Sequence, residues 1–331
     1  MIKFPRCIHT GILLLAVVVP LLAGCHHSLQ ENSGIRIITL KGPSAMGMIN
    51  LIDSAATIAG RPLAIEIVDE PMQARSRMLV DKPEIAVLPL NMAAIMYNKG
   101  VDYQLLAVPV WGTLYLTGTD STVRHWADLK GKTVHLMGKG ATPDILFRYL
   151  LEQHQILPDK DIRLDYTFPT HIDLSNAMIA GKASLAVLSE PLFSLAQARN
   201  PRIRQIMDLD IEWAAVTPED PTMPSTAILV RKDYARDHWK DIQAIAEAWN
   251  RSTEFVNQYP EKAAVRIAYH KIVPDAAVAL RSIPRCRLYF RYADEIRSAI
   301  QGNLKVFLTF NPDAIGGRLP DEKFIYTKPD H

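Results

Sequence analysis

The feature that most constrains the fold of this chain is a strand, a short loop and a helix that follow one another over residues 35–59. Ile35–Leu40 is a β-branched apolar run, which is typical of a buried parallel strand. Turn residues follow the strand, and Ser44 is expected to cap the next helix. Apolar residues then recur on one side of a helix that we expect to continue from Met48 to the end of the segment.

A second copy of this arrangement lies further along the chain. Thr133–Met137 has the composition of a strand, and Gly138–Ala141 has that of a loop. Thr142 is the expected N-cap of a helix, with Pro143 as its first residue and Asp144 as a first-turn acid. Open α/β sheets bind ligands beyond the carboxyl ends of their strands. The two loops therefore predict a cleft lined from both sides.

The chain begins with a segment typical of a secretory signal peptide. Its first ten residues include Lys3 and Arg6, and the apolar run Gly11–Ala23 that follows is too short to span a bilayer. The run ends in Leu22–Cys25, which resembles the lipobox of a bacterial lipoprotein. This resemblance implies that residues 1–24 are removed, that Cys25 is acylated, and that residues 25–33 form a tether.

Charge and cysteine content narrow the classes of partner. The full chain has 37 basic and 35 acidic residues, and removal of Lys3 and Arg6 with the signal peptide leaves a formal charge of zero. The chain has no Lys/Arg-rich block, so nucleic acid is not an expected partner. Cys7 leaves with the signal peptide and Cys25 is the lipid candidate. Cys286 is then alone, so we expect no intramolecular disulfide.

The rest of the chain alternates strands and helices in two blocks. The first runs from residue 35 to about 112 and the second from about 115 to 222, which predicts sheets with helices on both faces. The proline-rich Thr217–Pro224 is the best linker. Beyond the strand Thr226–Val230 the tail is mostly helical, so it is expected to pack on the first lobe. The other expected strands are 63–68, 85–88, 104–110, 163–167 and 185–188, and the other expected helices are 91–98 (capped by Asn91 and stopped at Gly100), 174–180, 239–258, 261–270, 275–282 and 294–310.

The layout resembles a type II periplasmic substrate-binding protein of an ABC importer. Within that group it is most similar to the branch that binds nitrate, sulfonates, taurine and pyrimidine precursors. The resemblance covers nearly the whole chain after the signal peptide. It is carried by residues 40–48 (LKGPSAMGM), 83–91 (PEIAVLPLN), 126–132 (WADLKGK), 138–143 (GKGATP), 225–230 (STAILV) and 316–324 (GGRLPDEKF).

The resemblance implies an α/β fold of two lobes, each a mostly parallel sheet flanked by helices. Residues 34–112 and 226–331 would form the first lobe, with the helical tail packed on it, and residues 118–220 the second. Residues 113–117 and 221–225 would be the hinge crossings. Such a protein closes around its solute, and closure shifts an equilibrium toward the form that docks on the transporter.

The implied function is the capture of a small polar organic solute and its delivery to an ABC permease and its ATPase. We expect an exported monomer that is lipid-anchored to a bacterial membrane and faces the periplasm or the cell exterior. No cofactor is expected. A ligand sensor without a permease stays an alternative, as does an enzyme on the same fold, resembling those of menaquinone or pyrimidine-precursor biosynthesis.

The sequence offers little for catalysis. It contains no G-x-S-x-G, H-E-x-x-H or P-loop lysine motif, so we assign no catalytic residue. Its histidines are scattered, and none has metal-ligand spacing, so we expect no metal. Export also argues against an enzyme of cytoplasmic metabolism.

The candidate solute-binding residues come from the loops after the predicted strands. Glu190 either accepts a bond from a ligand amine or is a solvated or hinge-paired carboxylate, and Trp111 either stacks on the ligand or fills the interlobe core. Backbone N–H groups at the two helix starts favour sulfonate-like anions slightly over a pyrimidine-like ring. The candidates are Pro43, Ser44, Ala45, Met46, Asn91, Trp111, Gly140, Ala141, Thr142 and Glu190.

Overall fold

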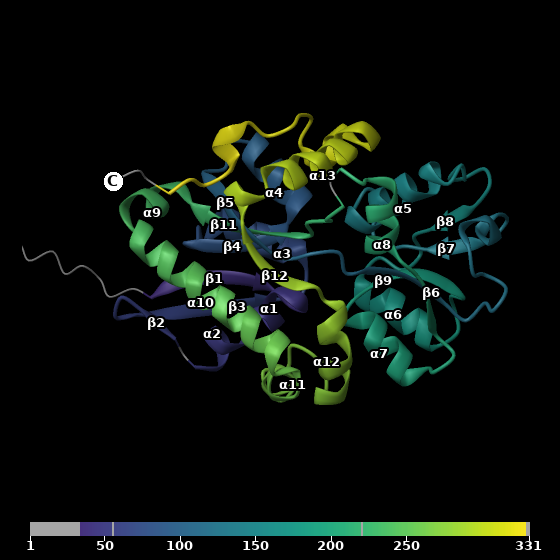
Figure 1. Ribbon diagram of the computed structural model, residues 1–331, viewed down its shortest axis with the longest axis horizontal. Helices are drawn as coiled ribbons and strands as arrows, with labels where there is room; N and C mark the ends of the chain where they lie inside the picture. Colours follow the sequence, from purple (N-terminus) through teal and green to yellow (C-terminus); the bar gives the residue numbers. More distant parts are fainter. Residues whose placement is uncertain (1–33, 55, 220, 329–331) are drawn as a thin grey trace, which may run out of the picture. The chain divides into compact units, whose positions relative to one another are not determined.

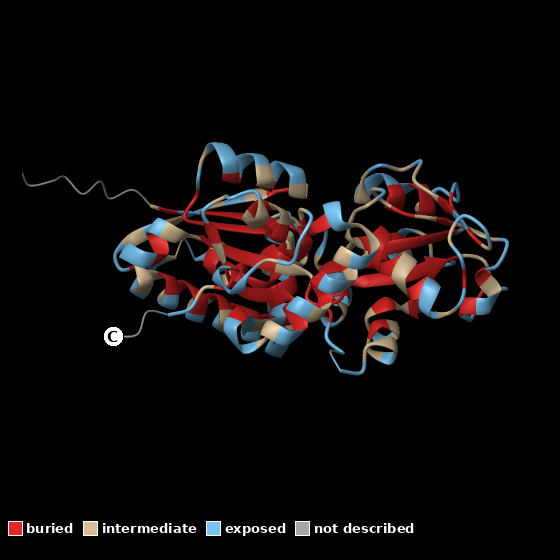
Figure 2. Cartoon of the chain, turned by 90° about the horizontal axis from the view of Figure 1, so that it is seen from above, coloured by how far each residue is buried: buried red, intermediate tan, exposed pale blue. Residues whose placement is uncertain are grey.

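The computed structural model describes residues 34–54, 56–219 and 221–328, and Figure 1 shows their arrangement. The predicted signal peptide, the tether and Cys25 lie outside the described residues. The strands sort into two sheets. Strands are mostly buried and the outer faces of the covering helices are exposed, as Figure 2 shows.

The first sheet has seven strands in the order β12-β5-β11-β4-β1-β3-β2. β1 runs parallel to β3 and to β4, as its apolar sequence predicts. β11 returns from the second sheet and enters antiparallel between β4 and β5. The strands are β1 (Ile35–Leu40), β2 (Thr57–Ile58), β3 (Arg61–Val68), β4 (Ile85–Pro89), β5 (Tyr103–Val110), β11 (Thr226–Arg231) and β12 (Leu288–Tyr292).

The second sheet has five strands in the order β10-β6-β9-β7-β8. β7 is parallel to β8 and β9, whereas β6 is antiparallel to β9 and β10. The predicted α/β fold of two helix-flanked sheets is confirmed, but both sheets are mixed rather than mostly parallel. In the first sheet β2, β11 and β12 run against their neighbours, and in the second β6 does. The strands are β6 (Leu114–Gly118), β7 (Thr133–His135), β8 (Arg163–Asp165), β9 (Leu185–Ser189) and β10 (Arg204–Asp208).

Helices cover both sheets. In Figure 1, α5 and α8 lie on one side of the second sheet, and α6 and α7 lie on the other. The longest helix, α10, packs on α1, α2 and β12 through an apolar face that includes the fully buried Trp249. The helices are α1 (Pro43–Gly47), α2 (Ile49–Asp53), α3 (Pro71–Val80), α4 (Leu90–Asn98), α5 (Thr142–Gln153), α6 (His171–Ile179), α7 (Leu192–Arg199), α8 (Leu209–Val216), α9 (Lys232–Asp237), α10 (Trp239–Gln258), α11 (Pro260–Tyr269), α12 (Ala276–Ser282) and α13 (Arg297–Phe310).

The helix expected after β1 is the main error in the predicted elements. The chain forms two five-residue helices, α1 and α2, with Met48 between them. Helical structure ends at Asp53, and Thr57–Ile58 forms the edge strand β2. The apolar spacing is helical over the whole segment, but pairing of β2 with β3 removes its last residues from the helix. Tertiary pairing thus overrides the local pattern.

Helix caps also differ from the predictions. α1 starts at Pro43 with Gly42 as its N-cap, so Ser44 lies inside the helix and does not cap it. α4 starts one residue before Asn91, with Pro89 as its N-cap. α5 has Ala141 as its N-cap and Thr142 as its first residue. Shifts of one residue are usual at helix ends. Because Ser44, Asn91 and Thr142 are not caps, their side chains are available for other contacts.

The tail contributes more to the first sheet than its sequence predicts. It adds the edge strand β12, which pairs with β5 and which the helical interpretation of the tail missed. The strand β10 was also missed in the second block. Residues 114–117 of the predicted hinge crossing lie in β6, and the two chain crossings pair with one another at Trp111 and Pro224.

Candidate functional site

The loops that follow the parallel strands of both sheets lie close to one another. Gly42, just after β1, has a φ of 102°, and a Cβ added there would lie 3.4 Å from Cδ of Pro191, just after β9. Glycine is therefore suited to this position for both its conformation and its close approach to the other loop. The loop after β1 and the loop after β9 thus face each other.

A hydrogen bond joins two candidate residues from the two sheets. The Thr142 hydroxyl, at the start of α5, donates to Oδ1 of Asn91, at the start of α4, over 3.0 Å. The Asn91 amide nitrogen donates to the carbonyl oxygen of Ala314 at 3.2 Å. Asn91 is buried and Thr142 is half-buried. The structure therefore brings these two candidates together.

The start of α5 already holds a carboxylate of the chain itself. Asp144, only 3% exposed, accepts a hydrogen bond from the backbone N–H of Gly140 at 2.7 Å. The Arg148 guanidinium and the Tyr166 hydroxyl donate to the same carboxylate. The Asp144 carboxylate thus already occupies the positive end of the helix dipole. A bound anion would therefore gain less binding free energy there than at a helix start without a carboxylate.

Glu190 is turned into the protein and has internal partners. Its carboxylate accepts bonds from the backbone N–H and the hydroxyl of Ser194, at 3.1 and 2.9 Å. The Arg285 guanidinium lies 3.5 Å from the same carboxylate and comes from the 3₁₀ turn before β12. Burial raises the pKa of Glu190 to about 7. Two roles were expected for Glu190: acceptance of a bond from a ligand amine, or a solvated or hinge-paired carboxylate. The observed contacts match a carboxylate paired between the two sheets.

Trp111 lies at the crossing between the sheets. Its indole N–H donates to the carbonyl oxygen of Tyr289 at 2.7 Å, and the residue is 7% exposed. The neighbouring Gly112 donates its backbone N–H to the carbonyl oxygen of Met223 on the returning chain. The indole therefore attaches the outgoing crossing to β12, and the backbone at Gly112 attaches it to the returning chain.

The side chains of three candidates of the first loop are almost fully buried. Ser44, Ala45 and Met46 are at most 2% exposed, and the last two belong to the apolar cluster beneath α11 and α12. Pro43 is half-buried at the first position of α1. This loop can contribute its backbone, but α1 has only five residues, so few peptide dipoles are aligned behind it.

Sequence analysis missed polar residues in neighbouring strand-end loops. The imidazole Nδ1 of His171, at the start of α6, lies 3.5 Å from the hydroxyl of Ser189, at the end of β9. Burial lowers the pKa of His171 to about 4, so this imidazole is neutral at pH 7. Burial and the carboxylates of Asp69 and Asp173 raise the pKa of Glu70, which follows β3. Position after a strand was a usable clue, whereas residue spacing was not.

Sequence analysis also missed a group of charged residues beside the crossing of the chain at Gly112. Arg287 contacts the carboxylates of Asp208 and Asp210 and donates to the carbonyl oxygen of Gly112 at 2.7 Å. Burial raises the pKa of Asp210 to about 6. A Cβ at Gly112 would overlap the Asp210 carboxylate, so glycine is required there. These groups join the tail to the second sheet.

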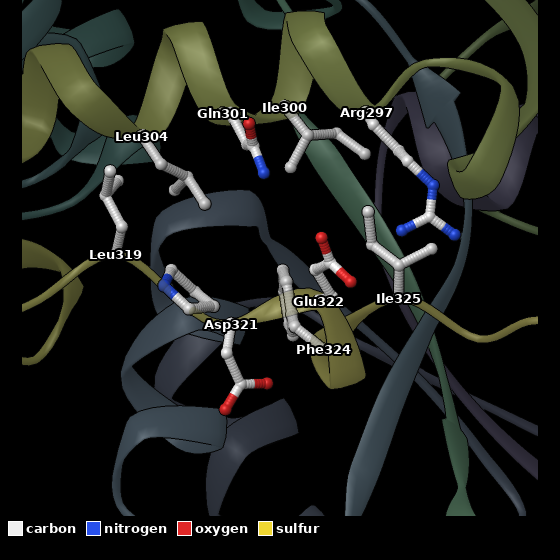
Figure 3. Close-up of a pocket in the computed structure, with 10 residues that line it drawn as sticks. Arg297, Ile300, Gln301, Leu304, Leu319, Asp321, Glu322, Phe324 and Ile325 are labelled. Atoms are coloured by element: carbon white, nitrogen blue, oxygen red, sulfur yellow. The ribbon is translucent and has the colours of Figure 1, made fainter.

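A pocket between α13 and the C-terminal segment is too small for an organic solute. Figure 3 shows its walls, which include Ile300 and Leu304 on one side and Phe324 on the other. Its volume of about 20 Å³ leaves room for roughly one water molecule. Within the described residues, no three His, Cys, Asp or Glu side chains gather closely enough to hold a metal ion.

Two helix-flanked sheets with facing strand-end loops have the fold of the type II periplasmic binding proteins. A family model described as "ABC transporter, phosphonate, periplasmic substrate-binding protein" matches residues 49–259. The chain therefore belongs to this family of periplasmic substrate-binding proteins of ABC transporters. The predicted family resemblance is confirmed, and the family places such proteins outside the cytoplasm.

Known proteins of similar structure agree with this assignment. An ABC transporter protein from Parabacteroides distasonis is 31% identical over 90% of this chain and 100% of its own, with a TM-score of 0.79. The periplasmic aliphatic sulphonate-binding protein SsuA from Escherichia coli is 17% identical over 90% of this chain and 94% of its own, with a TM-score of 0.70, and shows the fold alone. The binding protein YtlA of Bacillus subtilis is 28% identical over 163 residues, and the match covers 46% of each chain.

The described residues contain no helix that is both long and apolar enough to cross a membrane.

Proposed function

We propose that this protein captures a small organic oxyanion, a sulfonate or a phosphonate, at the strand-end loops and delivers it to an ABC permease. The observation that carries the proposal is the hydrogen bond between Asn91 and Thr142, which joins a helix start of one sheet to a helix start of the other. Polar residues from both sheets thus meet where α/β proteins bind ligands.

The polar groups beside these loops suit an oxyanion. Asp144 and Glu190 are each paired with an arginine of the chain, Arg148 and Arg285, so their charges are offset internally. Neutral polar groups lie in the strand-end loops: the Thr142 hydroxyl, which donates to Asn91, and the Ser189 hydroxyl beside the uncharged imidazole of His171. Hydrogen bonds from neutral donors to a charged acceptor are each worth about 1.5–3 kcal/mol.

The test is calorimetric titration of the mature protein with ethanesulfonate, taurine, methylphosphonate and orotate. We expect a sulfonate or the phosphonate to bind more tightly than orotate, and Thr142→Val to weaken that binding by about 10-fold. Thr142→Ser keeps the hydroxyl and is the matched control. Equal weakening in both variants, or preferred binding of orotate, contradicts the proposal.

The same titrations test the role of Glu190. Because its carboxylate is occupied by Ser194 and Arg285, we expect Glu190→Gln to leave oxyanion affinity within about threefold of the parent. Loss of binding of an amine-bearing heterocycle in this variant would make Glu190 a direct ligand contact instead.

Delivery requires movement of two lobes about the crossings. We propose residues 34–112 with 226–331 as one lobe, residues 118–220 as the other, and residues 113–117 and 221–225 as the hinge. Small-angle scattering should show that the protein becomes more compact at saturating oxyanion. An unchanged radius of gyration with a solute that binds would contradict hinge closure.

We also propose that Cys25 carries the lipid anchor, on the strength of Leu22–Cys25. Firm attachment to a membrane needs more than one acyl chain. Cys25→Ser should therefore yield a soluble or unprocessed protein in cell fractionation. A variant that is cleaved and still fractionates with membranes, as the parent does, would contradict the assignment.

A further inference from the structure

A pocket of about 270 Å³ lies on the first sheet, where two chain segments share one edge of β5. Tyr292, at the end of β12, pairs with Ala107 of that strand. Ile325, near the end of the described chain, pairs with Leu105. Leu106 lies between these two partners and lines the pocket. The volume approaches the lower limit of ordinary small-molecule sites.

The pocket has aromatic walls. Trp239, the first residue of α10, forms part of one side, and Tyr292 and Tyr326 come from the two edge segments. Leu106 and Ile242 are both buried and add apolar surface. An aromatic face attracts a cation that lies within about 6 Å of the ring centroid, most strongly when the ring is tryptophan.

The chain already places a cation in this pocket. The Lys328 ammonium lies 5.1 Å from the centroid of the Trp239 ring, and Lys328 itself lines the pocket. Lys240 lies 5.6 Å from the same ring. Lys328 is exposed and belongs to the last described segment, so an external cation can replace it without rearrangement of the sheet.

Two acidic residues lie beside the same volume. Asp294 and Glu295 follow β12 and line the pocket. The carboxylate of Glu247, one turn further along α10 from the pocket residue Gln243, also acts on Tyr292. Burial and these three carboxylates together raise the pKa of Tyr292. The electrostatic environment therefore favours positive charge, in contrast to the neutral donors of the strand-end loops.

We propose that this pocket binds a small organic cation with apolar substituents, such as a quaternary or alkyl ammonium ion, and that the Lys328 ammonium is its internal competitor. The aromatic rings receive the cation and its alkyl groups, and the two acids beside them balance its charge. The pocket lies outside the strand-end loops, so this site is separate from the proposed oxyanion site.

The test uses choline and its uncharged analogue 3,3-dimethyl-1-butanol with the mature protein. Binding is followed by the indole ¹⁵N–¹H resonance of Trp239, which Trp239→Phe assigns among the five tryptophans. We expect choline to shift this resonance in a saturable way and the neutral alcohol to bind at least about fivefold more weakly. Equal affinity for the two compounds would overturn the proposal.

The competitor is tested by Lys328→Ala. Removal of the internal ammonium should tighten choline binding by about 2- to 5-fold. Lys323→Ala is the matched control, because it removes the same charge from the same segment outside the pocket and should leave affinity unchanged. Equal effects of the two variants would show general electrostatics and contradict the role of Lys328.

The acids provide the last variant. Asp294→Asn with Glu295→Gln should weaken choline binding by about 5-fold or more while the melting temperature stays near that of the parent, since both side chains are exposed. An unchanged choline affinity in this variant would refute a cation site. The absence of any shift of the Trp239 resonance in Lys328→Ala at about 20 mM choline would refute it as well.

Discussion

The loop after β1 and the loop after β7 have similar sequences but different electrostatic surroundings. Both follow a parallel strand, and both contain small residues before a helix. The first leads into the five-residue α1 and a buried interior, and the second into the twelve-residue α5 with Asp144 in its first turn. Similar local patterns therefore do not imply two equal anion sites, because helix length and the chain's own carboxylates decide what each helix start can attract.

The largest expected difference between the two loops is in stability. Asp144→Ala should lower the free energy of unfolding by about 3–5 kcal/mol, because it removes a buried carboxylate that accepts from Gly140, Arg148 and Tyr166. The half-buried Arg148 guanidinium then keeps only the exposed Asp159 as a carboxylate partner. Ser44→Ala in the first loop should stay within about 1 kcal/mol of the parent, since alanine favours the helix. Urea unfolding measures both. Similar losses in the two variants would contradict the comparison.

The next effect is a pH dependence from Glu190, the carboxylate in the loop after β9. Its pKa is about 7 in the folded protein and about 4.5 when unfolded, so between these values the folded protein retains a proton that the unfolded chain releases. The stabilisation is full below pH 4.5 and is lost as the pH rises through 7. A shift of this size corresponds to roughly 3 kcal/mol.

Glu190→Gln isolates this contribution. The difference in unfolding free energy between parent and variant should change by that amount from pH 4.5 to pH 8, as measured by urea unfolding across the range. The exposed Glu254→Gln is the control and should show no such change. Asp210 titrates with the same sign between its ordinary pKa and about 6, and it is present in all three proteins. Parallel pH profiles for parent and Glu190→Gln would contradict the raised pKa and therefore the burial of this carboxylate.

The smallest effect distinguishes the backbones of the two loops. Gly42 has φ 102° and ψ −141°, a conformation nearly restricted to glycine, and Gly140 has φ 78°. Gly42→Ala should cost up to about 3 kcal/mol, and Gly140→Ala about 1–2 kcal/mol. Thermal unfolding of both variants measures the order. The reverse order would mean that the loop after β1 relaxes more easily than the loop after β7.

Elements with a strong pattern were predicted well from sequence. α10 occupies residues 239–258 as expected, and the buried strand β1 has the predicted bounds. The helix after Met48 was wrong because its last residues pair with β3, and the pattern of apolar residues cannot show that competition. β12 was missed because it is a segment of only five residues between helices, although its alternating burial is typical of a strand. Its partner β5 is distant in sequence.

The candidate site was predicted only in part. Asn91 and Thr142 are candidates because they follow strands, and the structure joins their side chains by a hydrogen bond. Position after a strand also applies to Glu70, which the sequence analysis does not single out, and to His171, whose spacing from the other histidines matches no metal site. Ser44, Ala45 and Met46 are candidates from the loop after β1, but the turn of α1 directs their side chains into the protein.

The sequence by itself determined the α/β class, the positions of most strands and long helices, and the family of the chain. The class and the elements follow from local apolar periodicity and turn residues, which act over a few positions. The family follows from the resemblance of motifs such as residues 126–132 and 138–143. Only the tertiary structure decided that Glu190 pairs with Arg285, that Arg287 holds Asp208 and Asp210 at the crossing, and that Lys328 lies over Trp239. Such pairs join segments far apart in the chain, and the packing of the elements between them sets which charges meet and which are buried.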